Sequence, residues 1–436
     1  MSNLHKIVIV GGGAAGLELA TKLGRKLGKR RKAEVVLIDA TRTHIWKPLL
    51  HQVASGSFDP GLHTVEYLAQ AQRNHFRFRM GSLESVDREA KQLWLSATVN
   101  EEGEEIIPRR SFSYDTLVLS IGSMANDFNI PGVQEHCWFL DNKKEALTFQ
   151  KRLMERLIYA VTHGDSVEPG QMDVAIVGAG ATGVELAAQL HEVTRRLRYY
   201  GFDSLDPAEH VRLKILDAGP RILPALPERL TNDVMSELND LGIEVLVNQR
   251  VTAVTKNGIE TASGETIPAA IKVWAAGIKA PKVLTEMGLE TNNINQVKVH
   301  RNLLSTVDAN IFAIGDCAEF PLDDNGVGVP PRAQAAHQEA SFVARAICRR
   351  LKGREDIGEY KYRDYGSLVT LGRYSTVGSL MGAISGNIWI SGFVARMVYL
   401  SLHKMHQLAV HGWFNTMLLT LSSMLRRSVN PEVKLH

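Results

Sequence analysis

The hydrophobic residues of this chain fall into short uninterrupted runs, which alternate with longer stretches of helical periodicity. Lys6–Val10 and Asp173–Val177 have the pattern of strands buried on both faces, and each leads directly into a glycine-rich turn and a helix. Glu34–Ile38 and Val211–Leu216 are predicted as further strands of this kind. Because buried strands that alternate with helices form parallel sheets, the pattern predicts the α/β class.

The two glycine-rich turns have the spacing Gly-x-Gly-x-x-Gly, which is typical of dinucleotide-binding folds. The first glycine allows a tight turn, the second lets the backbone approach a pyrophosphate, and the third lets the helix pack closely on the strand. The helix N-terminus then faces the phosphates with its partial positive charge. The candidate cofactor-binding residues are Gly11, Gly13, Ala14, Ala15 and Gly16 in the first turn and Gly178, Gly180, Thr182 and Gly183 in the second. Two such folds predict two dinucleotides, most economically a flavin and a nicotinamide that exchange a hydride.

An acid follows the second strand of each fold, Asp39 in the first and Asp217 in the second. An acid at this point binds the ribose 2′-hydroxyl of a dinucleotide, and it repels a 2′-phosphate. Asp217 stands later than usual, because the polar stretch Gly201–His210 precedes its strand. We therefore predict NADH rather than NADPH, although Arg221, close by in the sequence, could hold a phosphate instead.

The two folds also resemble each other at a third strand. Tyr114–Gly122 and Ile271–Gly277 are apolar runs that end in glycine, and Gly122 and Gly277 are candidates for close passage of a nucleotide. This repetition predicts a duplicated unit, with the second copy inserted in the first. The predicted division is 1–145 with 281–385 for the flavin domain, 146–280 for the NADH domain and 386–436 for a C-terminal region, with crossings near 142–147 and 277–281.

Composition narrows the function classes. The 436 residues are 44% hydrophobic and 22% charged, and the net charge of +3 does not by itself favour nucleic-acid binding. Cys137, Cys317 and Cys348 are far apart and form no Cys-x-x-Cys pair, so we expect no disulfide scaffold, no structural zinc site and no disulfide electron acceptor. The first strand begins so close to Met1 that we expect no signal peptide and a mainly cytoplasmic protein.

A later apolar run, Asn310–Ala318, ends in Gly315 and Asp316. With the two glycine turns, this segment resembles the two-dinucleotide-binding-domain flavoproteins, whose fold is that of glutathione reductase. The resemblance implies that the segment returns to the first domain and that Asp316 contacts the ribityl-pyrophosphate part of FAD. Asp316 is also suited to cap a helix, and the two roles are compatible.

The segment that follows Pro330 and Pro331 is predicted to begin a helix. Gln334 and Gln338 are four residues apart, so they share one face, where their amides can bond a carbonyl-bearing ring without adding charge. The run Ala333–Gln338 matches the Ala-Gln-x-Ala-x-Gln motif of type II NADH:quinone oxidoreductases. His44–Gly56, which contains Lys47, resembles the stretch that this family places beside the isoalloxazine.

The resemblance to this family runs nearly end to end. It implies non-covalent FAD as the sole prosthetic group, NADH as donor, a membrane quinone as acceptor, no proton pumping and commonly a homodimer. It also implies that Glu185, Gln334 and Gln338 surround the nicotinamide, the flavin and the quinone ring. Glu185 is alternatively a first-turn acid favoured by the helix dipole. His337 is a catalytic candidate, or else a structural histidine.

The C-terminal region has the pattern of a membrane-bound helix. Cations flank it, and a Trp lies within it, as in helices of the bilayer interface. The apolar positions are Val410, Trp413, Phe414, Met417, Leu418, Leu421, Met424 and Leu425. We expect a peripheral protein on the cytoplasmic face of the inner membrane, because Leu408–Leu425 is short for a spanning helix and contains polar residues. The alternative is a core or dimer contact.

Two other functions remain open at this stage. A sulfide:quinone oxidoreductase shares the fold but needs reactive cysteines and no nicotinamide. A non-enzymatic redox module of the apoptosis-inducing-factor type needs no glutamine pair. The histidines His403, His406 and His411 point to diverging faces of their helix, so no metal site is expected.

Overall fold

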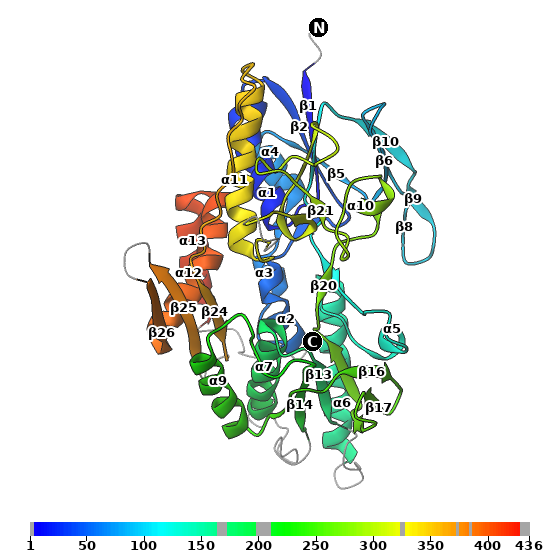
Figure 1. The fold of residues 1–436 in the computed structure, drawn as a ribbon, viewed down its shortest axis with the longest axis vertical. Coiled ribbons are helices and arrows are strands. Elements are labelled where there is room, and N and C mark those ends of the chain that lie inside the picture. The colour runs from blue at the N-terminus through cyan, green and yellow to red at the C-terminus, as the bar shows by residue number, and fades with distance from the viewer. Residues whose placement is uncertain are drawn as a thin grey trace.

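The computed structural model describes residues 4–163, 172–197, 211–322, 328–371, 375–382 and 386–427. Figure 1 shows two α/β units one above the other, with the C-terminal elements along one side of both. The stretch Gly201–His210 and the last residues of the C-terminal region, from 428 on, lie outside the described residues.

The upper unit is built on a five-stranded sheet with the order β22-β11-β1-β2-β5. All of its pairings are parallel, and β1 leads through the first glycine turn into α1. The strands are β1 His5–Val10, β2 Ala33–Asp39, β5 Arg77–Met80, β11 Thr116–Leu119 and β22 Ile311–Ala313. The return of β22 to this sheet confirms the duplicated, interrupted fold class predicted from the sequence.

The lower unit repeats this plan with a four-stranded parallel sheet of order β15-β14-β13-β19. Its central strand β13 leads through the second glycine turn into α7. The strands are β13 Val174–Val177, β14 Leu213–Leu216, β15 Glu244–Leu246 and β19 Ile271–Trp274. All four residues of β13 are buried, as are those of β19, because helices pack on one face of the sheet and a short antiparallel sheet formed by residues 251–268 packs on the other.

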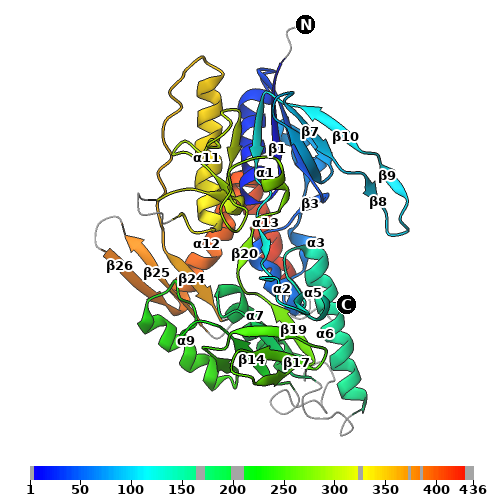
Figure 2. The ribbon, with the colours of Figure 1, turned by 45° about the vertical axis from the view of Figure 1, so that its right-hand side comes forward.

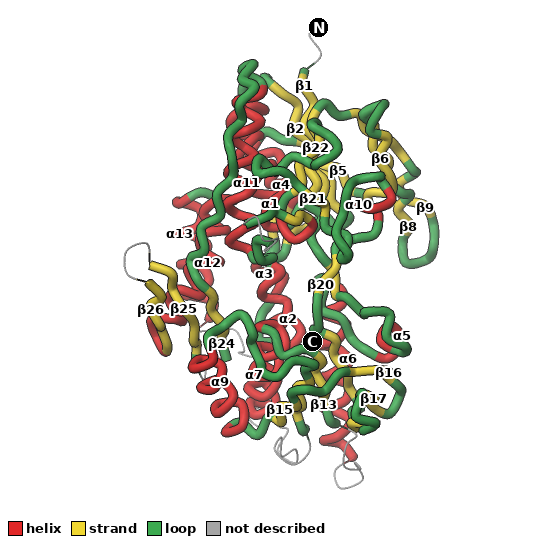
Figure 3. The backbone as a smooth tube through the Cα atoms, in the orientation of Figure 1, coloured by secondary structure: helices red, strands yellow, loops and turns green. Residues whose placement is uncertain are grey.

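The helices pack around and between the two sheets. In Figure 3, α2 lies between the units, and its Leu50, Val53 and Ala54 belong to the apolar core of the lower one. The helices are α1 Ala14–Leu23, α2 Leu50–Ser55, α3 Pro60–His63, α4 Tyr67–Asn74, α5 Val133–His136, α6 Lys143–His163, α7 Ala181–Leu197, α9 Glu228–Asp240, α10 Val283–Glu286, α11 Ala333–Arg350, α12 Gly392–His411 and α13 Trp413–Arg427.

Short antiparallel sheets complete both units. Their strands are β3 Thr43–His44, β4 Val65–Glu66, β6 Leu83–Asp87, β7 Gln92–Leu95, β8 Thr98–Val99, β9 Glu105–Ile107, β10 Arg110–Ser113, β16 Val251–Val254, β17 Gly258–Thr261 and β18 Thr266–Pro268, with β21 Val297–Lys298 parallel to β23 Ala318–Glu319. The chain passes between the units where β12 Met124–Ala125 pairs with β20 Ile278–Lys279. Trp138 already pairs with Val273 of β19, a few residues before the crossing predicted near 142–147.

The C-terminal region differs from the sequence prediction in two ways. A three-stranded antiparallel sheet, β24 Ser367–Thr370, β25 Thr376–Gly382 and β26 Gly386–Ser391, precedes the helices and was not predicted. The expected continuous helix is broken at Gly412, whose φ of +80° is the left-handed conformation that ends a helix. Within the described residues, no helix combines the length and the apolar character that crossing a bilayer requires.

Candidate active site

The two glycine turns have matching geometry. In the first, a Cβ on Gly11 would lie 2.1 Å from the Ser120 carbonyl oxygen, and φ at Gly11 is +99°. A Cβ on Gly16 would lie 1.8 Å from the Gly11 carbonyl oxygen, so the helix can approach the strand only without a side chain there. A Cβ on Gly13, in contrast, meets no atom within 4 Å. This backbone faces open space at the N-terminus of α1, which suits a phosphate group.

The second turn repeats each of these features. A Cβ on Gly178, where φ is +109°, would lie 2.7 Å from Ala275, and one on Gly183 would lie 2.0 Å from the Gly178 carbonyl oxygen. A Cβ on Gly180 meets nothing within 4 Å. Thr182 is exposed beside it at the start of α7. Both turns therefore provide an open backbone cradle of the kind that a dinucleotide pyrophosphate needs.

The acids at the ends of β2 and β14 accept hydrogen bonds from the backbone of these turns. One carboxylate oxygen of Asp39 accepts a hydrogen bond from the Gly12 N–H at 2.6 Å, and one of Asp217 accepts from the Ala179 N–H at 2.7 Å. Both acids remain partly exposed, as a contact with a ribose requires. The guanidinium of Arg221 donates to the carbonyls of Leu226 and Pro224.

Lys47 and Asp316 meet at a third loop of the upper unit. Ser123 links them, since its hydroxyl donates to Asp316 at 2.8 Å and its carbonyl accepts from the Lys47 ammonium at 2.7 Å. Gly122 beside it has φ of +70° and open space where a Cβ would stand. Sequence analysis did not single out Ser123.

The glycines that end the predicted strands differ in how much free space surrounds them. The Gly315 N–H donates to the buried Glu339 carboxylate on α11 at 2.6 Å, and burial raises the pKa of Glu339 to about 7. A Cβ on Gly277 would lie 2.5 Å from the Phe128 ring, so this glycine closes against a side chain where Gly122 faces space. The resemblance between the two third strands therefore does not extend to the room beyond their ends.

Glu185 is buried, with 6% of its surface exposed, and it contacts three other elements. Its carboxyl accepts from the Thr370 N–H of β24 at 3.0 Å, lies 3.5 Å from His51 Nδ1 of α2, and bonds the Tyr399 hydroxyl of α12. Burial raises the pKa of Glu185 to about 8 against these hydrogen bonds, and burial lowers the pKa of His51 to about 4. Both groups are therefore neutral at pH 7, and their contact is not an ion pair.

Gln334 and Gln338 lie on one face of α11, as predicted, but a neighbouring segment covers that face. The Gln334 amide donates to the Asp364 carboxylate and to the Gly366 carbonyl, and its oxygen accepts from the Tyr365 N–H. Gln338 donates to the Arg363 carbonyl at 2.8 Å and accepts from the Arg363 N–H at 3.0 Å. Among the described residues, nothing bonds the second amide hydrogen of Gln338. Sequence reasoning missed this segment, since nothing in the motif indicates what packs on it.

The structure also bears on the cysteines and on possible metal ligands. Burial raises the pKa of the Cys137 and Cys317 thiols to about 12, so both stay protonated at neutral pH, which disfavours a cysteine-dependent quinone reductase. In the described part of the chain, no group of three or more His, Cys, Asp or Glu side chains is arranged to hold a metal ion.

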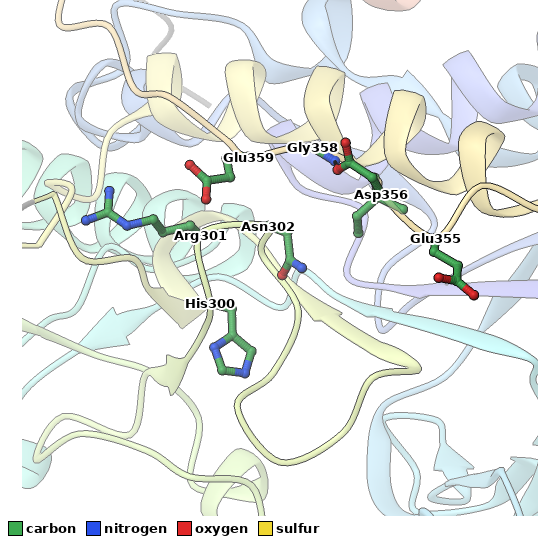
Figure 4. A pocket seen from close by; sticks show the side chains of 8 residues that line it. His300, Arg301, Asn302, Glu355, Asp356, Gly358 and Glu359 are labelled. Atoms are coloured by element: carbon green, nitrogen blue, oxygen red, sulfur yellow. Dashed lines mark hydrogen bonds between the residues drawn. The ribbon is translucent and has the colours of Figure 1, made fainter.

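A separate surface hollow of about 420 Å³ contains none of the candidate residues. Figure 4 shows three acids of the segment after α11 on one side of it and a basic turn on the other. It is lined by His300, Arg301, Asn302, Glu355, Asp356, Ile357, Gly358 and Glu359. Because no residue of either glycine turn lines the hollow, we do not assign it to the candidate site.

Comparison with known proteins agrees with this geometry. The family model described as pyridine nucleotide-disulphide oxidoreductase matches residues 5–340. A type II NADH:quinone oxidoreductase of Haemophilus influenzae is 41% identical, over 99% of this chain and 100% of that protein. The type II NADH:quinone oxidoreductase NdhA of Mycobacterium tuberculosis is 31% identical, over 92% of this chain and 83% of its own length.

Solved structures share the fold at lower identity. NDH2 from Plasmodium falciparum in complex with NADH superposes with a TM-score of 0.83 and 18% identity, over 99% of this chain and all of that one. The sulfide:quinone oxidoreductase of Aquifex aeolicus has a TM-score of 0.71 and 19% identity, over 94% of this chain and 92% of that one, which is a likeness of fold alone. The chain belongs to the pyridine nucleotide-disulphide oxidoreductase family and, within it, to the type II NADH:quinone oxidoreductases.

Proposed function

We propose that this protein oxidises NADH with a bound FAD and reduces a membrane quinone, without pumping protons. The observation that carries the proposal is the pair of matching glycine turns, each with one backbone position open to a ligand, Gly13 and Gly180. FAD supplies the hydride acceptance and the electron transfer, while the protein supplies binding, orientation and proton positions.

The upper unit is the proposed FAD-binding domain, formed by residues 1–145 and 281–385. Its open backbone at Gly13 and Gly122, and the Lys47–Ser123–Asp316 contact beside them, suit a long diphosphate ligand with a polar linker. The residues proposed to bind FAD are Gly11, Gly13, Ala14, Ala15, Gly16, Asp39, Lys47, Gly122, Gly315 and Asp316.

The lower unit, residues 146–280, is the proposed NADH-binding domain. Gly178, Gly180, Thr182, Gly183 and Asp217 are proposed to hold the dinucleotide, with Gly277 at the edge of the site. A carboxylate at Asp217, together with an Arg221 already bonded to two carbonyls, supports NADH over its phosphorylated form. Glu185, held neutral by its burial, is proposed to face the nicotinamide without adding negative charge.

The quinone is proposed to approach α11 beside the segment 363–366, where His337 and Gln338 remain partly exposed. Gln334 has both amide hydrogens engaged by residues 364 and 366, so its role is to hold that segment in place. Gln338 retains an unbonded amide hydrogen among the described contacts, and His337 is 31% exposed. These two side chains are the proposed contacts to the quinone carbonyls.

The proposed membrane contact is α13, in the C-terminal region 386–436. Its outer face is exposed and apolar, whereas Thr416 on the opposite face is buried. The exposed apolar residues are Trp413, Phe414, Met417, Leu418, Leu419, Leu421, Met424 and Leu425. An exposed apolar face of this length suits insertion into the headgroup region of a bilayer. We also propose that the protein binds the cytoplasmic side of the membrane and that it forms a homodimer.

Anaerobic stopped-flow spectroscopy tests the function. NADH is expected to bleach the flavin absorbance, and a soluble quinone is expected to restore it. Mass spectrometry of the released flavin distinguishes FAD from FMN, and sedimentation measures the oligomeric state. Purified protein that is colourless and takes up no flavin contradicts the proposal, as does a bleached flavin that quinone leaves bleached.

A further inference from the structure

Residues 25–32, which connect α1 to β2, form a short segment that is dense in positive charge. Six of these eight residues are Lys or Arg, and none is an acid. All six of these side chains are exposed, namely Arg25, Lys26, Lys29, Arg30, Arg31 and Lys32. Because the whole chain has a net charge of +3, it would have a net charge of −3 without them. This stretch, the basic segment, is therefore the source of the positive charge of the protein.

Close packing fixes the backbone of the basic segment on the end of α4. The segment begins within a π-helical turn that follows α1. A Cβ on Gly24 would lie 2.1 Å from the Asn74 carbonyl oxygen, and a Cβ on Gly28 would lie 2.0 Å from that of His75. Leu27, between the two glycines, is 6% exposed and belongs to the core of the upper unit. The cations are therefore carried on a backbone whose position is set by the fold.

Neighbouring acids do not neutralise this charge. The two acids nearest in the sequence bind other cations, since Glu18 lies 3.3 Å from the Lys22 ammonium and Glu34 lies 2.6 Å from Nη1 of Arg77. Among the described residues, none of the six cations forms an ion pair with a carboxylate. Clustered like charges repel one another and raise the free energy of the folded state. An anionic partner at this surface would relieve that repulsion.

The basic segment touches the junction between α12 and α13. Arg25 Nη2 donates to the Val410 carbonyl at 3.1 Å, and its Nε donates to the Asn74 side-chain oxygen at 2.7 Å. Gln70 of α4 donates to the same Val410 carbonyl at 2.7 Å. Figures 1 and 2 show α12 and α13 beside the upper unit, and α12 packs on α1. Trp413, the first residue of α13, follows Val410 by three residues, which span at most about 11 Å. The helix proposed to enter the membrane therefore begins next to the basic segment.

An apolar helix that begins beside clustered cations fits a bilayer that contains anionic lipid. Trp413 is 72% exposed and Phe414 is 54% exposed, so both can enter the headgroup region. Lys and Arg side chains near a membrane surface are attracted to anionic headgroups, over a range of about 8 Å at physiological salt. Nucleic acid also binds basic clusters, but it would leave the aliphatic face of α13 unused. The two neighbouring features together favour lipid.

We propose that the basic segment binds anionic lipid headgroups and directs the protein to negatively charged membrane. This rests on the membrane contact proposed for α13, and it adds a second contact from the opposite end of the chain. The apolar face of α13 inserts into the bilayer, and this term does not depend on lipid charge. The basic segment supplies the preference for anionic lipid and makes binding sensitive to salt.

The test measures co-sedimentation of the flavin-loaded protein with two kinds of vesicle, pure phosphatidylcholine and a mixture with about one-third phosphatidylglycerol. The variant combines four substitutions, Lys26→Gln, Lys29→Gln, Arg30→Gln and Lys32→Gln. Arg25 is kept because it bonds Val410, and Arg31 because its φ is +50°. The affinity of the variant for the anionic vesicles is expected to fall at least thirtyfold, because each cation near the surface contributes about fivefold. Its affinity for phosphatidylcholine is expected to stay within twofold of wild type.

The matched control removes the same charge from the lower unit. It combines substitutions to Gln at four exposed positions, Lys151, Arg156, Arg229 and Lys256. This control is expected to bind both kinds of vesicle as wild type does. Flavin content and turnover with ferricyanide are expected to be unchanged in both variants, which shows that they fold. Raising NaCl from about 0.05 M to about 0.5 M is expected to weaken binding to anionic vesicles at least tenfold in wild type and less than threefold in the variant of the basic segment.

Three results overturn the proposal. The first is equal binding of anionic vesicles by wild type and by the variant of the basic segment, and the second is equal weakening in the control. The third is loss of binding to a single-stranded RNA without loss of vesicle binding, which assigns the segment to nucleic acid. Wild-type protein that binds neither kind of vesicle contradicts the membrane contact proposed for α13 instead.

Discussion

The two glycine turns place a glutamate at the same position, two residues after the last glycine, yet the two carboxyl groups differ in charge. Glu18 follows Gly16 and Glu185 follows Gly183, and both are buried. The pKa of Glu18 is lowered to about 2, whereas that of Glu185 is raised to about 8. Local sequence and backbone are alike, so the difference must come from the partners that pack against each one.

Those partners come from other parts of the chain. Glu18 receives hydrogen bonds from two imidazoles, His337 and His406, which stabilise a carboxylate. Glu185 receives one backbone N–H and one phenol, and its histidine neighbour, His51, is itself too buried to charge. One helix, α12, supplies a partner to each. Tyr399 and His406 are seven residues apart, which is two helical turns along one face.

The strongest test of this comparison blocks each turn in the same way. Gly13→Val and Gly180→Val place a side chain where no protein atom lies within 4 Å, and Gly13 has extended φ and ψ that valine can adopt. Both proteins are therefore expected to fold. Gly13→Val is expected to lose flavin, seen as loss of visible absorbance. Gly180→Val is expected to keep flavin but to need at least 100-fold more NADH for half-maximal bleaching. Loss of flavin from both variants would contradict the division of the two cofactors between the turns.

The opposite pKa shifts predict opposite effects of pH on stability. Because the native-state pKa of Glu18 lies below its unfolded value of 4.5, its contribution is present above pH 4.5 and is lost as the pH falls toward 2. Because the native-state pKa of Glu185 lies above 4.5, the native state loses stability as the pH rises from 4.5 to 8. At about 1.4 kcal/mol per pKa unit, these effects amount to roughly 3 and 5 kcal/mol.

Denaturant unfolding at several pH values measures both effects. Glu185→Gln is expected to flatten the loss between pH 5 and 8, and Glu18→Gln the loss below pH 4.5. Each variant is the control for the other, since the two glutamates differ in partners but not in local position. Identical pH profiles in the two variants would show that the two environments do not differ as described.

The two C-terminal helices extend the comparison, because α12 packs on both units whereas α13 exposes its apolar face. Leu421→Glu with Met424→Glu places two charges on that face. Binding to anionic lipid vesicles, measured by co-sedimentation, is expected to weaken more than tenfold. Flavin content and turnover with ferricyanide are expected to stay unchanged. Equal vesicle binding by the variant would show that another surface makes the contact.

The smallest expected effect is a shift in the pH dependence of flavin reduction, which tests the contact between α12 and Glu185. The Tyr399 hydroxyl bonds the Glu185 carboxyl and lowers its pKa, so Tyr399→Phe is expected to raise that pKa further. If Glu185 acts as a neutral acid, the rate of flavin reduction by NADH falls above its pKa, and this fall moves to higher pH in the variant. His406→Gln, two turns along the same helix, is the control and is expected to leave the fall in place. Stopped-flow measurements from pH 6 to 10 compare the three proteins.

Much of the fold could be predicted from the sequence, because its signals are local. Buried strands such as β1 and β13 appear as apolar runs, and the glycine spacing reports backbone that must turn tightly or approach a helix. Gly16 and Gly183 were predicted from spacing alone, and a Cβ at either would collide with the carbonyl of the first glycine. The sheet β24–β25–β26 was missed, since a single short sheet at the edge of the molecule leaves little periodic signal. The break at Gly412 was missed because the apolar spacing continues through it.

The chemistry of the site was less predictable, because it depends on contacts between distant residues. Gln334 and Gln338 share a face as their spacing requires, but the segment 363–366 that binds them is not apparent in the motif. Glu18 was not singled out, although it occupies the position equivalent to Glu185. Nothing local separates the two residues.

The amino-acid sequence by itself determined the α/β class, the two glycine turns and the acids behind them, because glycine conformation and strand burial are properties of neighbouring residues. Only the tertiary structure decided which buried glutamate carries a charge. That outcome depends on whether imidazoles or a backbone amide and a phenol reach the carboxyl, and those groups come from residues as distant as His406 and Thr370. A pKa responds to the three-dimensional surroundings of a group, and the order of residues along the chain does not contain those surroundings directly.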